Sequence, residues 1–490
     1  MSDPDLKRPL SGSSSLTIAI FGGVTAAFTL GVVLLVILSG TDPGNTGAEG
    51  YLPLAYAAFG VILTAIVVSA CIRRLRVQVS AALAWLVGII SFLLSFIPWW
   101  GIAGSNSDLG VFIYRGLRVP QGIIQFWDLS LVMQSVDCAR WGFDIYAENN
   151  GCLAEPSIYA PGMVWLQYVP LDLFSEANVK VLGLIMMVIS SVVLFSLARM
   201  SKGLGQIVLL IAAVGGPWLL LLERANIDSI VIWVAVLSAV LIVKFGFKEP
   251  SASTLRVLWP WIVAATLIWI VGTWKYYPFA LGLMLLPAVR LKRGWVVVLG
   301  FGVASVGYVI LTWSNFQYSS QANSGMVDYR DLGVLGRIPV VARMLDYGDL
   351  MFYLLALSAV VWGVFVSREV FQIRRFNVVS PVFAMLAAGG SVLYLASVLV
   401  AGFGYGYKAV FLLLAVPLLS RWVGSQIRVV AGSSLLILIF IAIESFVVWN
   451  TVLVTTVGVV AAGFALGAAL PMLIGSSDRP WGKRLAPAVQ

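Results

Sequence analysis

Apolar runs long enough to cross a bilayer follow one another along most of the chain, and they constrain the fold more than any other feature. The hydrocarbon core of a bilayer is about 30 Å thick, which an α-helix of about 20 apolar residues crosses. Such runs occur at residues 17–39, 53–72, 78–99, 181–198, 204–222, 229–243, 257–274, 295–313, 350–367, 379–401, 430–449 and 451–474. Two shorter runs lie at 276–289 and 405–422. We therefore predict an all-α polytopic membrane protein with about 13 or 14 transmembrane helices.

The composition agrees with this class and excludes others. Of the 490 residues, 60% are hydrophobic and only 11% are charged, whereas soluble domains carry about 25% charged residues. A cytosolic enzyme and a nucleic-acid-binding protein are thereby excluded. The chain contains no histidine, which removes the commonest general base and metal ligand, and every Ser-His-Asp arrangement.

The distribution of charge predicts the orientation in the membrane. With the N-terminus in the cytoplasm and fourteen alternating spans, 21 of the 31 Lys and Arg residues face the cytoplasm. Of the 22 acidic residues, sixteen face outward, five face inward, and Glu444 lies within a span. Cytoplasmic loops of membrane proteins carry an excess of Lys and Arg. We therefore expect both termini in the cytoplasm, and we interpret the first run as a retained anchor.

The spans and connections divide the chain into five predicted parts. These are three N-terminal spans (1–99), an extracytoplasmic loop with amphipathic helices (100–180), central spans (181–313), a second extracytoplasmic loop (314–349), and C-terminal spans with a short cytoplasmic tail (350–490). Every predicted cytoplasmic connection is short. We therefore expect any functional site on the extracytoplasmic side.

The first large loop begins with a candidate general base. In the stretch SNSDLGVFIYRG, Asp108 and Arg115 fall on one face if the segment is helical. A carboxylate at the membrane surface can accept a proton from a hydroxyl group while nearby cations balance the charge of a phosphate. The alternative is that Asp108 caps the N-terminus of this helix. Downstream, the apolar pattern of 119–136 predicts an amphipathic helix on the membrane.

The rest of this loop contains a predicted disulfide and candidate sugar-binding residues. Cys138 and Cys152 lie in one polar segment, and a bond between them would close a loop of about 15 residues; two unpaired thiols are the alternative. Asp144 and Tyr159 supply the carboxylate and aromatic groups that suit a polyol ligand. A surface loop without a ligand explains them equally well.

Cations also collect at outer ends of spans, where the positive-inside tendency depletes them. Arg224 and Asp228 connect two central spans, Lys275 follows another, and Lys408 lies in a Gly-Tyr-Gly-Tyr-Lys turn. Each is explained on its own as an interfacial anchor. Together they are the groups that a site for a lipid-linked phosphate needs.

Four short motifs carry a resemblance to a family. They are SNSDLGVFIYRG, the Tyr159-Ala160-Pro161 element, ERANIDSIVIW at the start of one span and TWKYYPF before another. With them the chain resembles the GT-C superfamily of integral membrane glycosyltransferases, especially bacterial members that use polyprenyl-phosphate sugars. The resemblance implies an inverting transfer with Asp108 as general base and with Arg224, Lys275 and Lys408 on the donor phosphate. From their residue types and positions, we interpret Arg115, Asp144, Tyr159 and Asp228 as candidate acceptor- or sugar-binding residues.

These observations lead to one expected function and two alternatives. We expect a sugar to pass from a polyprenyl-phosphate donor to a glycan or glycolipid acceptor at the outer face of a bacterial plasma membrane. The expected partners are these substrates and membrane lipids, without nucleic acid. We expect no cofactor, and the scattered carboxylates do not indicate a metal. The alternatives are an O-antigen-type polymerase or ligase, with the second loop as its site, and a lipid flippase or permease.

Overall fold

The computed structural model describes residues 81–103, 126–147, 151–153, 157, 159–169, 176–246, 254–317, 348–372, 380–399, 406–446 and 452–474. Within these residues there is no β-strand, and the all-α prediction is confirmed. In chain order the elements are α3 (Ala81–Ala103), α5 (Trp127–Arg140), the 3-10 helix η2 (Pro161–Tyr168), α6 (Glu176–Met200), α7 (Leu204–Ala213), α8 (Gly216–Glu223), α9 (Asp228–Leu241), the π-helical turn η3 (Ile242–Gly246), α10 (Thr254–Trp274), the 3-10 helix η4 (Tyr277–Arg290), α11 (Gly294–Leu311), α14 (Gly348–Gln372), α15 (Pro381–Leu399), the 3-10 helix η7 (Gly406–Ala415), α16 (Val416–Trp422), α17 (Arg428–Phe446) and α18 (Val452–Ile474).

Among the described helices, eight are long and apolar enough to cross a membrane. They are α6, α9 with η3, α10, α11, α14, α15, α17 and α18. A ninth candidate consists of α7 and α8, which pass the same test together but are bent by 48°. The predicted runs from 78–99 onward coincide with described helices, whereas the runs at 17–39 and 53–72 lie outside the described residues. The chain is therefore a polytopic membrane protein.

The two shorter predicted runs contain 3-10 helix, and they therefore extend further than α-helices with the same number of residues. The 14 residues of η4 form a 3-10 helix, which rises about 2.0 Å per residue and therefore covers about 28 Å, against about 21 Å for an α-helix. The second run combines η7, of 10 residues, with α16, of 7 residues, for a similar length of about 30 Å. Both segments thus approach the thickness of the hydrocarbon core.

Small residues allow α14 and α18 to pack closely. A β-carbon added at Gly467 of α18 would lie 2.0 Å from the carbonyl oxygen of Val360 in α14. One added at Gly363 of α14 would lie 2.2 Å from the carbonyl oxygen of Phe464. Helices in a bilayer associate by such close backbone contact, because lipid offers no hydrophobic driving force between them.

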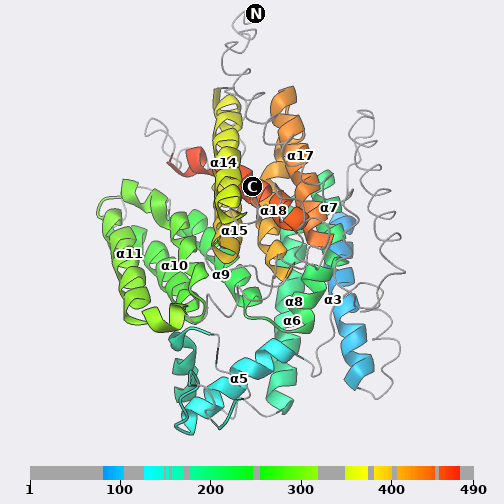
Figure 1. The fold of residues 1–490 in the computed structure, drawn as a ribbon. Helices are drawn as coiled ribbons and strands as arrows, with labels where there is room; N and C mark the ends of the chain where they lie inside the picture. Colours follow the sequence, from blue (N-terminus) through cyan, green and yellow to red (C-terminus); the bar gives the residue numbers. More distant parts are fainter. Residues whose placement is uncertain are drawn as a thin grey trace, which may run out of the picture.

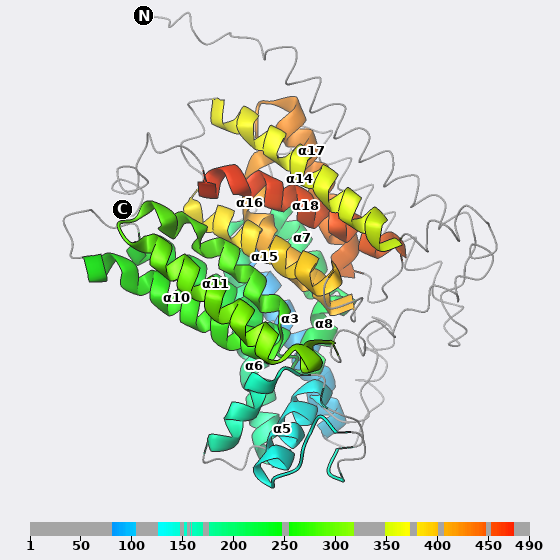
Figure 2. The same ribbon diagram turned by 60° about the vertical axis from the view of Figure 1, so that its left-hand side comes forward.

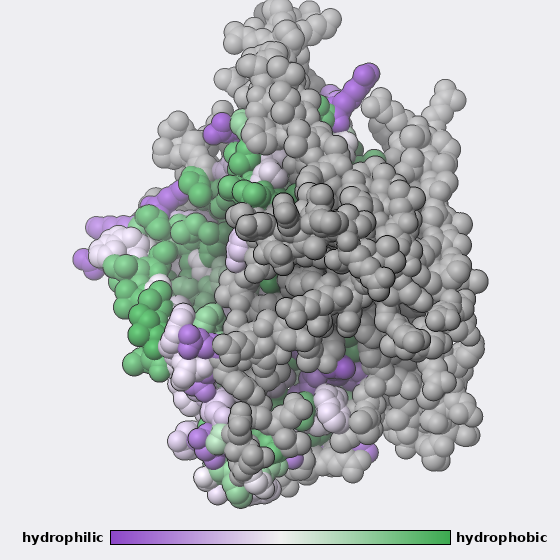
Figure 3. Space-filling view, viewed as in Figure 1, coloured by the Kyte–Doolittle hydropathy of each residue, from purple (hydrophilic) through white to green (hydrophobic). Residues whose placement is uncertain are grey.

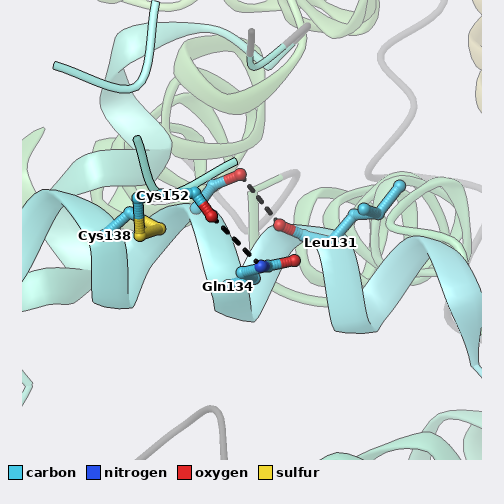
Figure 4. The surroundings of a disulfide bond; sticks show 5 residues. Leu131, Gln134, Cys138 and Cys152 are labelled. Atoms are coloured by element: carbon cyan, nitrogen blue, oxygen red, sulfur yellow. Dashed lines mark hydrogen bonds between the residues drawn. A yellow bond between two sulfur atoms is a disulfide. The ribbon is translucent and has the colours of Figure 1, made fainter. Parts of the chain in front are cut away.

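A small outer layer covers one end of this bundle. In Figures 1 and 2, α5 lies across the end of the bundle, below α6 and α8. The Arg140 guanidinium at the end of α5 donates hydrogen bonds to the carbonyl oxygens of Gln167 and Val169, at 3.1 and 2.9 Å. Cys138 of α5 forms a disulfide with Cys152, and Gln134 contacts the carbonyl oxygen of Cys152 (Figure 4). The layer is thus held together by covalent and polar contacts.

The surface of the bundle suits a lipid environment. Only 11% of α11 is buried within the protein, and its outward side chains include Val303, Val306 and Ile310. In Figure 3 the hydrophobic surface extends over the side of the molecule that carries α10 and α11, and hydrophilic residues lie toward both ends of it, including the end that carries α5. This pattern agrees with a helical bundle in lipid and a polar layer in water.

Candidate functional site

Two lysines from distant parts of the chain share one buried carboxylate. Lys275 follows α10, and its Nζ lies 2.7 Å from Oδ1 of Asp228, the first residue of α9. Lys408 of η7 approaches the other oxygen of the same carboxylate, Oδ2, at 3.2 Å. Asp228 is completely buried, whereas the side chains of Lys275 and Lys408 remain 14% and 10% exposed. This arrangement is the centre of the ionic cluster, which we define below.

Aromatic rings complete the surroundings of the two lysines. The hydroxyl group of Tyr277 donates to Oδ1 of Asp228, and the Lys408 ammonium lies 4.2 Å from the centre of the Tyr277 ring. The Lys275 ammonium lies 5.5 Å from the centre of the Tyr159 ring. A cation over an aromatic face is attracted by the ring quadrupole. The rings thus stabilise cations that burial would otherwise disfavour.

The third cation, Arg224, joins the site through a second carboxylate. Its Nη1 lies 3.4 Å from Oδ1 of Asp128, in the first turn of α5. The amide of Asn226 connects Asp128 to Lys275, because its Nδ2 donates to Oδ2 of Asp128 and its Oδ1 accepts from Lys275 at 3.0 Å. We define the ionic cluster as Asp128, Arg224, Asn226, Asp228, Lys275 and Lys408.

The turn between α8 and α9 positions three members of the cluster. Ala225 adopts a left-handed conformation (φ 45°) at the end of α8, and the Asn226 N–H bonds to the carbonyl oxygen of Leu221 at 3.1 Å. The Asn226 side chain accepts from the backbone N–H of Asp228 at 2.9 Å, which forms an Asx turn immediately before α9. A left-handed residue other than glycine costs about 1–2 kcal/mol. The backbone of this turn is therefore locally strained, and the turn brings the side chains of Arg224, Asn226 and Asp228 together.

The outer layer docks on the same turn through its backbone. The N–H groups of Phe126 and Leu129 donate to the carbonyl oxygens of Glu223 and Arg224, at 3.2 and 3.3 Å. Phe126 is also left-handed (φ 55°), and its ring packs where a β-carbon on Gly183 of α6 would clash with it at 2.3 Å. These contacts place Asp128 at the edge of the cluster.

Burial dominates the electrostatics of the groups that the outer layer contributes. It raises the pKa of the Asp128 carboxyl, an effect that Arg224 and then Asn226 partly offset. Burial also raises the pKa of the Tyr159 hydroxyl well above its ordinary value, and the nearby charges of Asp128 and Asp228 raise it further. Charged carboxylates are costly in such a position. The burial of charged groups in the cluster therefore lowers the stability of the folded protein.

The cluster carries an excess of positive charge. Its three cations face two carboxylates, which leaves one net positive charge. The Lys275 ammonium has three N–H groups, and two of them are used by Asn226 and Asp228. Among the described residues, no group of three or more Cys, Asp or Glu side chains is arranged to hold a metal ion. The arrangement suits a monovalent anion that accepts hydrogen bonds.

No protein-family model matches this chain, and no curated protein or solved structure does either.

The structure brings five of the sequence-predicted site residues into contact through the cluster and leaves one apart. Arg224, Asp228, Lys275 and Lys408 are members, and Tyr159 packs on Lys275. Asp144, in contrast, is exposed and accepts a hydrogen bond from the N–H of Tyr146 at 3.0 Å. It stabilises a turn of the disulfide loop. Asp108 and Arg115, and the second-loop segment 318–347, lie outside the described residues.

Sequence reasoning missed three residues of the site. Asp128 falls in the segment predicted as an amphipathic helix, of which the structure describes α5 from Trp127 to Arg140. Asn226 and Tyr277 lie within the motifs ERANIDSIVIW and TWKYYPF, but an amide and a phenol next to lysines and acids attract little notice. The one available indication for Asp128 was a carboxylate within an apolar stretch, IIQFWDLSLV.

A second buried polar pair lies between the spans. Tyr394 of α15 donates to Oε1 of Glu444 in α17 at 2.6 Å, and both side chains are buried. Gly458 of α18 faces the pair, because a β-carbon there would lie 1.9 Å from the Tyr394 hydroxyl oxygen. Ionisable residues within spans are rare. Here Gly458, which has no side chain, leaves room for the Tyr394 hydroxyl group and the Glu444 carboxyl group.

Proposed function

We propose that this protein is a membrane glycosyltransferase that transfers a sugar from a polyprenyl-phosphate donor to a glycan or lipid-linked acceptor, at the extracytoplasmic face of a bacterial plasma membrane. The observation that carries the proposal is the convergence of Arg224, Lys275 and Lys408 in one cluster with a single net positive charge. A polyprenyl-phosphate sugar is a phosphodiester and carries one negative charge, so the two charges match.

The cluster also supports the proposal by its preorganisation. Asp228 and Asn226 hold the Lys275 ammonium with two of its N–H groups, and among the described residues the third has no hydrogen-bond partner. An ammonium group whose position is fixed before the ligand arrives loses little entropy on binding. Such groups stabilise charge that develops on a leaving group more effectively than water does.

The proposed reaction inverts the anomeric carbon of the donor sugar. The acceptor hydroxyl gives its proton to the carboxylate of Asp108, and its oxygen forms the new bond to the anomeric carbon. The bond between this carbon and the phosphate oxygen breaks, and the electron pair leaves with the polyprenyl phosphate. Arg224, Lys275 and Lys408 would stabilise that leaving anion. This scheme needs no metal.

The test uses the full-length protein in nanodiscs with synthetic short-chain polyprenyl-phosphate sugars and a panel of acceptors. We expect mass spectrometry to detect a glycosylated acceptor, and we expect Asp108→Asn to abolish transfer while donor binding persists. Lys275→Ala should weaken donor binding or slow release of the leaving group. The matched control is Lys180→Gln, which changes a lysine near the start of α6 outside the cluster. The absence of transfer from every donor, or normal kinetics of the Lys275 variant, would contradict the proposal.

Polymerases and ligases of the O-antigen type, which also use polyprenyl-linked donors, are the alternative enzymes. The same assay separates them by whether one sugar or a whole glycan is transferred. A flippase or permease would instead move lipid or solute across proteoliposomes without forming a new glycosidic bond.

A further inference from the structure

The amide of Asn226 faces a negative group at one end and a positive group at the other. Its Nδ2 donates to Oδ2 of Asp128. Its Oδ1 accepts from the Lys275 ammonium at 3.0 Å and from the backbone N–H of Asp228 at 2.9 Å. The side chain is almost completely buried, with 1% of its surface exposed. Both ends of the amide are therefore committed to partners inside the protein.

These partners allow only one orientation of the amide. If the group were rotated by half a turn, its NH2 would face the ammonium of Lys275 and its oxygen would face the carboxylate of Asp128. Both contacts would then be repulsive, and both donors and acceptors would be left unsatisfied in a buried position, which is unfavourable. The carboxylate of Asp128 thus selects the orientation that presents Oδ1 to Lys275.

Asp128 reaches this amide only because the outer layer is docked. It belongs to α5, whose start is held by the backbone hydrogen bonds of Phe126 and Leu129 to the α8–α9 turn. Asn226 belongs to that turn, and Lys275 belongs to the end of α10. The contact chain therefore runs from the outer layer through one side chain to a cation of the cluster.

We propose that Asp128 is a positioning residue, which holds the Asn226 amide in the orientation that directs the Lys275 ammonium toward the bound anion. The inference rests on the proposed function in one respect, namely that Lys275 binds the phosphate of the donor. The position of Lys275 itself does not depend on that function.

The cost of this carboxylate supports a functional role. Burial raises the pKa of Asp128, and the ion pair with Arg224 is long, at 3.4 Å. Replacing a buried ion pair with neutral groups is often neutral or stabilising. Asp128 lies at the edge of the cluster despite this cost, with Arg224 and Asn226 as its partners.

The first readout is the rate at which a water-soluble amine reagent labels Lys275, measured by mass spectrometry relative to Lys180 in the same sample. In Asp128→Leu the amide is released, and we expect labelling of Lys275 to increase on the order of tenfold, as the loss of one hydrogen bond to a charged group implies. Asp128→Asn retains an oxygen that accepts from the Asn226 amide, so it should rescue most of the effect. The control variant is Asp137→Asn, which removes another buried carboxylate of α5, paired with Arg140 at 3.1 Å.

The second readout is the affinity for farnesyl phosphate, a short polyprenyl phosphate. We expect Asp128→Leu to weaken binding on the order of tenfold, and Asp128→Asn to weaken it less. Asn226→Leu should reproduce both effects of Asp128→Leu, and the double variant should add nothing further, because the two residues act in series. Asn226→Leu also carries the test if Asp128→Leu does not fold.

The outcomes separate this inference from the proposed function. If Asp128→Leu and Asn226→Leu leave Lys275 labelled as in Asp137→Asn, the positioning role is wrong. If Lys275 labelling changes as expected but Lys275→Gln does not alter farnesyl phosphate binding, the positioning role stands and the proposed function fails.

Discussion

Lys275 and Asp228 lie 47 positions apart in the chain, yet their side chains meet at 2.7 Å in a buried site. The second oxygen of this carboxylate serves Lys408, which comes from a third part of the chain. One acidic side chain thus fixes two cations that hydropathy places at separate span ends. Removal of the Asp228 carboxylate should therefore affect both Lys275 and Lys408.

Substitution of Asp228 by Asn should destabilise the protein strongly. It leaves two mostly buried ammonium groups without their shared counter-charge, which typically costs about 3–5 kcal/mol. Thermal unfolding in detergent should show a large decrease in Tm. Asp144→Asn is the control, because Asp144 is exposed and its substitution should change stability by no more than about 0.5 kcal/mol. Equal stability of the two variants would show that the lysines do not depend on Asp228.

The stability of the wild type relative to Asp128→Asn should decrease with rising pH. Burial raises the pKa of Asp128 above its ordinary value of 3.8, so the folded state binds this proton more tightly than the unfolded state. The stabilisation is complete below about pH 3.8 and is lost as the pH rises through the higher folded value. Tm values of both proteins between pH 4 and 8 test this. A difference in Tm that stays constant, or changes in favour of the wild type, would contradict it.

Removal of the disulfide should loosen the outer layer. Cys138 and Cys152 are separated by 14 positions, and closure of a loop of this size contributes about 3 kcal/mol on the entropic model. We expect the double Cys→Ser variant to be cleaved faster by protease between residues 139 and 151. Cys71→Ser, which changes the remaining cysteine, is the control. A cleavage rate that matches this control would mean that noncovalent contacts alone order the loop.

Gly458→Ala should disrupt the pair of Tyr394 and Glu444. The added β-carbon would lie 1.9 Å from the Tyr394 hydroxyl oxygen and 2.9 Å from the Glu444 carboxyl carbon. Overpacking of this kind typically costs about 1–3 kcal/mol, so Tm should decrease. Gly432→Ala in α17 is the control, since no heavy atom lies within 4 Å of its β-carbon position. Similar Tm values for the two variants would show that the helices move apart at little cost.

Sequence reasoning reached the cations of the site but not the groups that hold them. Arg224, Lys275 and Lys408 were identified because positive charge at an outer span end runs against the general tendency. Asn226 and Asp128 carry no comparable indication, since an amide in a turn and an acid near the start of a helix are ordinary surface residues in most proteins. Both residues matter because they are buried and hydrogen-bonded to one another. The local sequence specifies neither the burial nor this contact.

The sequence by itself determined that the chain crosses a membrane as helices and where most of these helices lie, because a bilayer requires each span to bury its own backbone polar groups within an apolar segment of fixed length. It also placed the cations at the span ends. Only the tertiary structure decided that Asp228 bridges Lys275 and Lys408, and that Asn226 connects Asp128 to Lys275. Such contacts depend on how helices from distant parts of the chain pack and on a few ångströms of side-chain geometry, which periodicity and composition do not specify.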